Sequence, residues 1–159
     1  SRRAARIVII PDVNLLVYAY NSDAPHHQQA KAWWEHGMGS RQPIAIPWVV
    51  ALGFLRITTS RAVLPRPMAM ETALGHVRSW LDQPAVRILQ PGPRHLGILT
   101  SFGEAGVLTA ALMTDAHIAA LAIENQATVH SNDSDFSRFP GLHWINPLND
   151  VRAIGAPPG

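Results

Sequence analysis

A three-layer α/β fold with a central, mostly parallel sheet is the architecture that this sequence predicts. Short runs of branched apolar residues alternate along the chain with longer segments whose apolar residues recur at helical spacing. Helices that connect successive strands favour parallel pairing and right-handed crossovers. Asp12 and Asp133 each follow a strand-like run, at the place where open α/β sheets bind their ligands.

The first half of the chain contains two strand signals and three helix signals. A strand is expected at 7–10, where four branched apolar residues are consecutive, and a helix at about 14–20. The second helix is predicted by four residues at the spacing of a buried helical face: Ala30, Trp33, Trp34 and Gly37. The glycine-rich segment 37–43 is expected to be a loop. A short strand at 44–46 then leads into a helix that begins at Pro47 and runs toward Ser60.

The second half continues the alternation. Five apolar residues predict a helix that ends before a proline: Met70, Ala73, Leu74, Val77 and Leu81. The remaining expected elements are a strand at 86–89, helices at about 96–104 and 116–125, and strands at 128–130 and 143–145.

Length and composition predict one globular domain. The chain has 159 residues, of which 47% are hydrophobic and 15% are charged, enough apolar material for a sizeable core. We expect a single domain over 7–150, preceded by a basic stub at 1–6 and followed by a flexible tail at 151–159. We find no internal repeat and no long linker.

Several classes of function are excluded by what the sequence lacks. Cysteine is absent, which rules out disulfides, thiol catalysis and zinc–thiolate sites. No apolar run is long enough for a membrane span, and no signal-peptide pattern occurs. We therefore expect a cytoplasmic protein with no membrane partner.

The distribution of charge favours a polyanionic partner. The formal net charge is +2 and the sequence pI is about 9.7. Arginines gather in the N-terminal stub and again in the middle of the chain: Arg2, Arg3, Arg6, Arg56, Arg61 and Arg66. Basic groups beside an acidic site suit a phosphate-bearing substrate. The alternative is that these arginines only keep the surface soluble.

Four aspartates at the edges of predicted elements form the candidate catalytic site: Asp12, Asp115, Asp133 and Asp135. Each also has a structural interpretation. Asp12 and Asp115 could cap or begin helices, and the pair at 133 and 135 could form an Asx turn. If they converge, however, two carboxylates about 4 Å apart repel by roughly 4 kcal/mol at an effective dielectric constant of 20. Protons or a cation must relieve this repulsion, and ligation by oxygen alone favours Mg²⁺ or Mn²⁺.

The sequence resembles the PIN-domain ribonucleases, and most of all the VapC toxins of bacterial toxin–antitoxin pairs. Four segments in the family's order carry the resemblance: 10–18 (IPDVNLLVY), 47–59 (PWVVALGFLRITT), 114–122 (TDAHIAALA) and 131–142 (SNDSDFSRFPGL). The resemblance covers nearly the whole chain.

This resemblance implies a site, a cofactor and partners. The family's metal-binding acids match Asp12, Asp115 and Asp133, with Asp135 alongside. These acids would hold Mg²⁺ or Mn²⁺ and support hydrolysis of RNA. The resemblance also implies a homodimer and a VapB-type antitoxin that silences the toxin.

One position departs from the family's pattern. The family's second acid, usually a glutamate, falls in register with Gly53. Glu71 and Glu104 are possible substitutes, although nothing in the sequence places either at the site. A catalytically weak or inactive PIN-like module that binds RNA or antitoxin is therefore an alternative hypothesis.

Two further hypotheses rank below these. A phosphatase of the haloacid dehalogenase type is suggested by the strand that ends in Asp12, but that chemistry requires a second acid where this chain has Asn14. Eight histidines allow a zinc site, yet no recognisable pair of ligands is formed. The five tryptophans are expected in the core or at a dimer interface.

Overall fold

The computed structural model describes residues 7–149, and the predicted basic stub and C-terminal tail lie outside this range. Five strands form one sheet: β1 (Ile9–Pro11), β2 (Ile44–Pro47), β3 (Val86–Leu89), β4 (Thr128–His130) and β5 (His143–Ile145). The strand order is β3-β2-β1-β4-β5, and all four pairings are parallel. The predicted α/β class and parallel sheet are confirmed.

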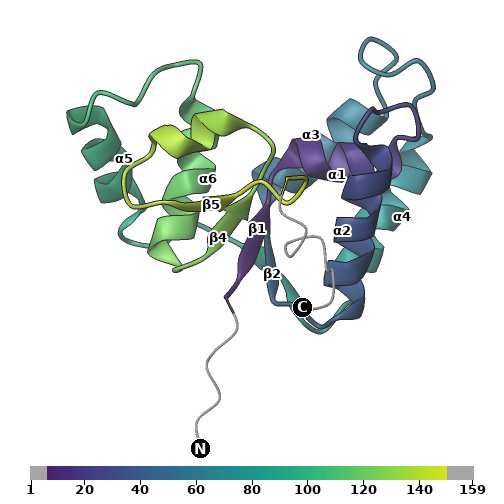
Figure 1. Ribbon diagram of the computed structural model, residues 1–159, viewed down its shortest axis with the longest axis horizontal. Coiled ribbons are helices and arrows are strands. Elements are labelled where there is room, and N and C mark those ends of the chain that lie inside the picture. Colours follow the sequence, from purple (N-terminus) through teal and green to yellow (C-terminus); the bar gives the residue numbers. More distant parts are fainter. Residues whose placement is uncertain (1–6, 150–159) are drawn as a thin grey trace, which may run out of the picture.

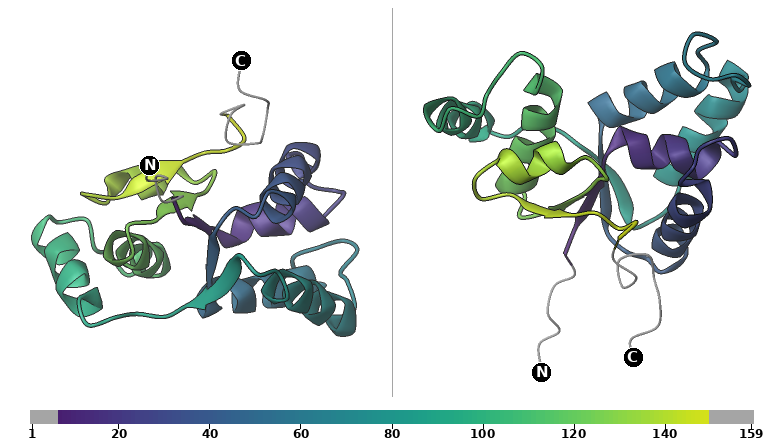
Figure 2. Two further views of the ribbon diagram at one scale, coloured as in Figure 1. Left: turned by 90° about the horizontal axis from the view of Figure 1, so that it is seen from below. Right: turned by 45° about the horizontal axis from the view of Figure 1, so that its top comes forward.

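The helices cover the two faces of the sheet unequally (Figure 1). The first four lie together on one side: α1 (Val13–Tyr20), α2 (His27–Gly39), α3 (Trp48–Thr58) and α4 (Met70–Leu81). The other side carries α5 (His95–Glu104), α6 (Met113–Glu124) and the short 3-10 helix η1 (Ser134–Arg138). The views in Figure 2 show the sheet between these two groups, which makes the three layers.

The loop predicted at 37–43 begins three residues later than expected. Its first three residues continue α2 to Gly39, and residues 40–43 lie between α2 and β2 as predicted. Glycine costs a helix about 1 kcal/mol relative to alanine, so packing must offset the cost here. Met38 packs against the core, and a Cβ at position 37 would lie 3.5 Å from Cδ1 of Ile44, an ordinary contact.

An aromatic cluster anchors the layer of α1–α4. Trp80 and Phe54 are fully buried, with ring centroids 4.7 Å apart in an edge-on arrangement. The indole N–H of Trp80 donates a 2.8 Å hydrogen bond to the hydroxyl of Tyr20, which satisfies the polar group of each ring. Trp33 and Trp34 are also buried, as expected for core tryptophans, whereas Trp48 is 46% exposed.

The order of the strands fixes where a site can form. Successive connections run from β1 to β2 and β3 on one side, and the chain then returns to place β4 on the other side of β1. The order in which the chain adds strands therefore reverses between β1 and β4. In open α/β sheets such a topological switch point is where ligands bind. No helix in residues 7–149 combines the length and the apolarity needed to cross a membrane.

Candidate active site

Asp12 lies at the topological switch point between β1 and β4. It follows β1 directly, and its backbone N–H donates to the carbonyl of His130 at the end of β4 (2.9 Å). Its Oδ1 accepts a 2.8 Å hydrogen bond from the N–H of Val13, so Asp12 also caps α1. The predicted capping role and a place at the site are thus compatible, because one oxygen serves the cap.

The second oxygen of Asp12 is held by Ser131, a residue that the sequence did not single out. The Ser131 hydroxyl donates to Oδ2 of Asp12 (2.7 Å) and accepts from the N–H of Asp133 (3.0 Å). Ser131 is fully buried and Asp12 is 4% exposed. This hydroxyl therefore joins the acids that follow β1 and β4.

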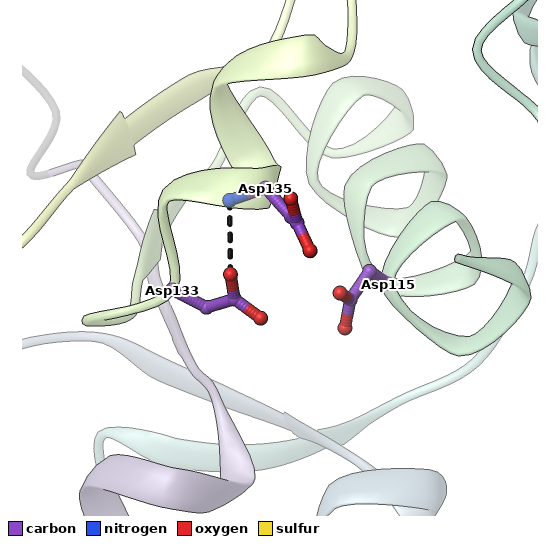
Figure 3. Close-up of side chains that lie close together, drawn as sticks. All are labelled: Asp115, Asp133 and Asp135. Atoms are coloured by element: carbon purple, nitrogen blue, oxygen red, sulfur yellow. Dashed lines mark hydrogen bonds between the residues drawn. The ribbon is translucent and has the colours of Figure 1, made fainter. Parts of the chain in front are cut away.

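Three other carboxylates face one another beside Asp12 (Figure 3). Asp115 comes from the first turn of α6, while Asp133 and Asp135 come from the cap and first turn of η1. One ligand atom from each of the three lies within 4.8 Å of the others. The N–H of Asp135 donates to Oδ1 of Asp133 (2.9 Å), which fixes the turn between them.

The charges of the four acids act on one another. Burial raises the pKa of Asp115 to about 6, with the negative charges of Asp12, Asp133 and Asp135 adding to the shift. Burial also raises the pKa of Asp12, against the lowering effect of its hydrogen bonds with Ser131 and Val13, and the charge of Asp133 raises it further. Asp12 and Asp115 thus cost free energy to ionise, and a divalent cation is the ligand that reverses this cost.

The three mutually close carboxylates differ in one member from the ligand set expected from the sequence. The expected metal ligands were Asp12, Asp115 and Asp133, whereas the close group contains Asp135 in place of Asp12. Asp12 still feels the charge of Asp133 and acts on Asp115, so it belongs to the same acidic region. In residues 7–149 no histidine takes part in a group of three or more possible metal ligands.

Gly53 lies against Val13, the residue that follows Asp12, and its possible substitutes lie elsewhere. A Cβ at position 53 would lie 3.0 Å from Cγ2 of Val13, the residue that follows Asp12. Glu71 lines an apolar groove of about 580 Å³ between α3 and α4, together with Trp48 and other residues of those helices. Glu104 lies at the end of α5. Neither glutamate belongs to the described carboxylate group.

Of the arginines expected to meet phosphate, Arg66 is paired with Asp23 at the surface. Among the arginines of residues 7–149, Arg138 is the one with an ion pair to the carboxylates, and the sequence did not indicate it. Its Nε donates to Oδ1 of Asp135 (3.1 Å). Its spacing of three residues from Asp135 permits this ion pair, but such a spacing is too common in sequences to have identified it.

A model of the PIN domain matches residues 9–142, which includes all four acids. The chain belongs to the PIN domain family. Among curated relatives, Ribonuclease VapC33 of Mycobacterium tuberculosis is 44% identical over 147 residues, covering 90% of this chain and all of the relative. Ribonuclease VapC37 of the same organism is 37% identical over 138 residues, covering 87% of this chain and 96% of the relative.

Solved structures show the same fold. VapBC2 of Rickettsia felis, bound to a DNA fragment from its promoter, matches with a TM-score of 0.63 at 22% identity, over 87% of this PIN-domain chain and 98% of the other. M. tuberculosis VapC20, described as a Sarcin-Ricin loop cleaving toxin, matches with a TM-score of 0.57 at 18% identity, over 85% and 98%. The predicted resemblance to PIN-domain VapC proteins is confirmed.

Proposed function

We propose that this PIN-domain chain is a metal-dependent endoribonuclease toxin that hydrolyses RNA phosphodiester bonds and is inhibited by a cognate VapB-type antitoxin. The observation that carries the proposal is the group of carboxylates near the topological switch point between β1 and β4. Support comes from the full-length relatives named Ribonuclease VapC and from the VapBC complexes that share the fold.

The proposed catalytic residues are Asp12, Asp115, Asp133 and Asp135. Asp115 and Asp133 belong both to the expected ligand set and to the close carboxylate group, so we assign them as metal ligands first. Each carboxylate oxygen of Asp12 accepts one hydrogen bond, from Val13 and from Ser131, and these two bonds fix the orientation of the carboxylate. Bound Mg²⁺ or Mn²⁺ would activate water and stabilise charge on the RNA phosphate.

The first test is the dependence of hydrolysis on metal. Because all the acids offer oxygen ligands, cleavage of single-stranded RNA should cease after dialysis against a chelator and return with Mn²⁺ or Mg²⁺. Fluorescence of a doubly labelled RNA oligonucleotide measures the rate. Cleavage that continues at the same rate in chelator would rule out the proposed chemistry.

A non-catalytic PIN-like binding module is the second candidate, because Gly53 offers no carboxylate where the family usually has its second acid. Intact RNA or antitoxin binding without metal-dependent turnover would favour this candidate. Robust hydrolysis would eliminate it.

Gly53→Glu tests the vacant acid position directly. A glutamate there would require a small shift of the Val13 side chain and would add a carboxylate next to the residue that follows Asp12. We expect Mn²⁺ binding to tighten by about 10-fold in calorimetric titration, the effect of one added charged ligand. Gly53→Gln is the matched control, because it meets Val13 in the same way without the charge. Equal affinities for the two variants would show that position 53 does not face the metal.

The proposed partners are RNA, the antitoxin and a second copy of the chain. Exposed apolar side chains suited to protein contacts occur on α3 and α4 (Trp48, Leu52, Leu74) and near α5 and α6 (Leu96, Met113). Light scattering of the purified chain measures the homodimer, and co-purification tests the antitoxin. We place the proposed activity in the cytoplasm, where cellular RNA is found.

A further inference from the structure

Arg138 lies at the rim of the carboxylate group. It is the last residue of η1, the same short helix that carries Asp135, and its Nε donates to Oδ1 of Asp135 at 3.1 Å. The Arg138 side chain is 61% exposed, and that of Asp135 is 41% exposed. The guanidinium is therefore one hydrogen bond away from a carboxylate of the proposed metal site and open to solvent.

Most of the hydrogen-bonding capacity of Arg138 is unused. A guanidinium has five N–H donors, and only the one on Nε has a partner among residues 7–149. Arg66 provides the contrast, because Asp23 engages its Nε and Nη2 together. The terminal nitrogens of Arg138 thus retain the planar fork that matches a phosphate.

A positive charge beside the acids would offset their repulsion of an RNA phosphate. Four aspartates close together repel a polyanion, yet the proposed substrate must bring a phosphate to them. In the described part of the chain, the ion pair of Arg138 is the one that reaches this group. An exposed ion pair at i, i+3 contributes little stability, so the pair with Asp135 does not make Arg138 important for folding.

We infer that Arg138 is a substrate-binding residue that holds an RNA phosphate beside the carboxylates, while Asp135 orients its guanidinium. This inference rests on the proposed function. Asp135 engages only Nε, so the terminal nitrogens of Arg138 are available to the phosphate, and a divalent cation held by the acids would add positive charge beside it. Arg138 acts through binding and takes no part in proton transfer.

RNA binding without hydrolysis is the first test. In an Asp115→Asn background with chelator present, anisotropy of a labelled single-stranded RNA should show binding weakened about 3- to 10-fold by Arg138→Gln. The slope of log affinity against log salt should fall by about 0.7, the value for one phosphate contact on a single strand. Arg138→Lys should keep most of the slope, because it keeps the charge.

The matched control is Arg78→Gln, which removes an exposed arginine from α4, on the side of the sheet away from η1 (Figure 1). It should leave both the affinity and the slope unchanged. An Arg138→Gln variant whose RNA affinity and slope equal those of its parent would overturn the inference.

Metal titration and steady-state kinetics distinguish two roles of Arg138: binding the RNA phosphate, and positioning Asp135. In the hydrolysing protein, Arg138→Gln should raise KM about 3- to 10-fold with kcat nearly unchanged, the pattern of lost uniform binding. Mn²⁺ affinity should not fall. Weaker Mn²⁺ binding with unaltered RNA binding would mean that Arg138 only positions Asp135, which contradicts the inference.

The inference and the proposed function fail in different ways. If the unmodified chain hydrolyses no RNA with Mn²⁺ but still binds RNA through Arg138, the nuclease proposal is wrong and the phosphate contact stands. If hydrolysis requires Asp115 and proceeds identically in Arg138→Gln, the nuclease proposal stands and the phosphate contact is wrong.

Discussion

Asp115→Asn should abolish RNA hydrolysis and at the same time stabilise the metal-free protein. The variant removes a ligand from the close carboxylate group, and we expect the rate to fall by at least about 100-fold, as for the loss of a group that holds charge in the transition state. It also removes a carboxylate that ionises reluctantly, because its pKa is raised to about 6 by burial and by Asp12, Asp133 and Asp135. An amide of the same shape carries no such cost.

The pH dependence of stability follows from the direction of that shift. A carboxyl group whose folded pKa lies above its unfolded value binds more protons in the folded state, so it favours folding at low pH. This contribution is lost as the pH rises from about 4 through 6. Above pH 7, after a discount for solvent screening, Asp115→Asn should gain on the order of 1 kcal/mol, or about 2–4 °C in Tm.

Thermal melts in chelator between pH 4 and 8 measure this difference, and Asp82→Asn at the exposed end of α4 is the control. For the same reason, Mn²⁺ affinity of the unmodified chain should fall as the pH drops below about 6, because protons compete for Asp115. A variant that hydrolyses RNA at the original rate would remove Asp115 from the site, whatever its stability.

Ser131→Ala should destabilise the protein by about 1–3 kcal/mol and weaken metal binding. The hydroxyl is fully buried and satisfies two groups, Oδ2 of Asp12 and the N–H of Asp133. Without it, Asp12 loses a hydrogen bond that lowers its pKa, so its ionised form becomes harder to reach. The segment that carries Asp133 also loses an anchor to β1.

Urea unfolding and Mn²⁺ titration measure the two effects. Ser137→Ala is the matched control, since that exposed hydroxyl donates only to the nearby carbonyl of Ser134 and its loss should change stability by less than about 0.5 kcal/mol. Equal stability and equal Mn²⁺ affinity for Ser131→Ala and Ser137→Ala would show that the bridge to Asp12 has no energetic importance.

The fold and the convergence of the acids could be predicted because both follow from periodicity. Branched apolar runs alternate with helical faces, which dictates a parallel sheet, and parallel strands bring their carboxyl ends to one edge. Asp12 and Asp133 are 121 positions apart in sequence, yet Pro11 pairs with His130 in adjacent strands. The convergence therefore required only the correct topology.

The finer features could not be predicted, because they depend on local geometry that periodicity does not encode. The continuation of α2 through Gly37 and Gly39 depends on tertiary packing, which overrides the low helix propensity of glycine. The roles of Ser131 and Arg138 depend on individual hydrogen bonds to Asp12 and Asp135. A serine after a strand and an arginine in a turn are too common in sequences to signal either role.

The central place of β1 in the sheet has a consequence for synthesis of the protein. β1 is the first strand to leave the ribosome, but its neighbour β4 contains residues 128–130, and Asp133 and Asp135 come later still. An incomplete nascent chain therefore lacks half of the acids, and Asp12 lacks the hydroxyl that orients it. The proposed toxic activity should consequently appear only after Asp133 and Asp135 have been translated, so that products released by ribosomes stalled before these residues are harmless to the cell that makes them.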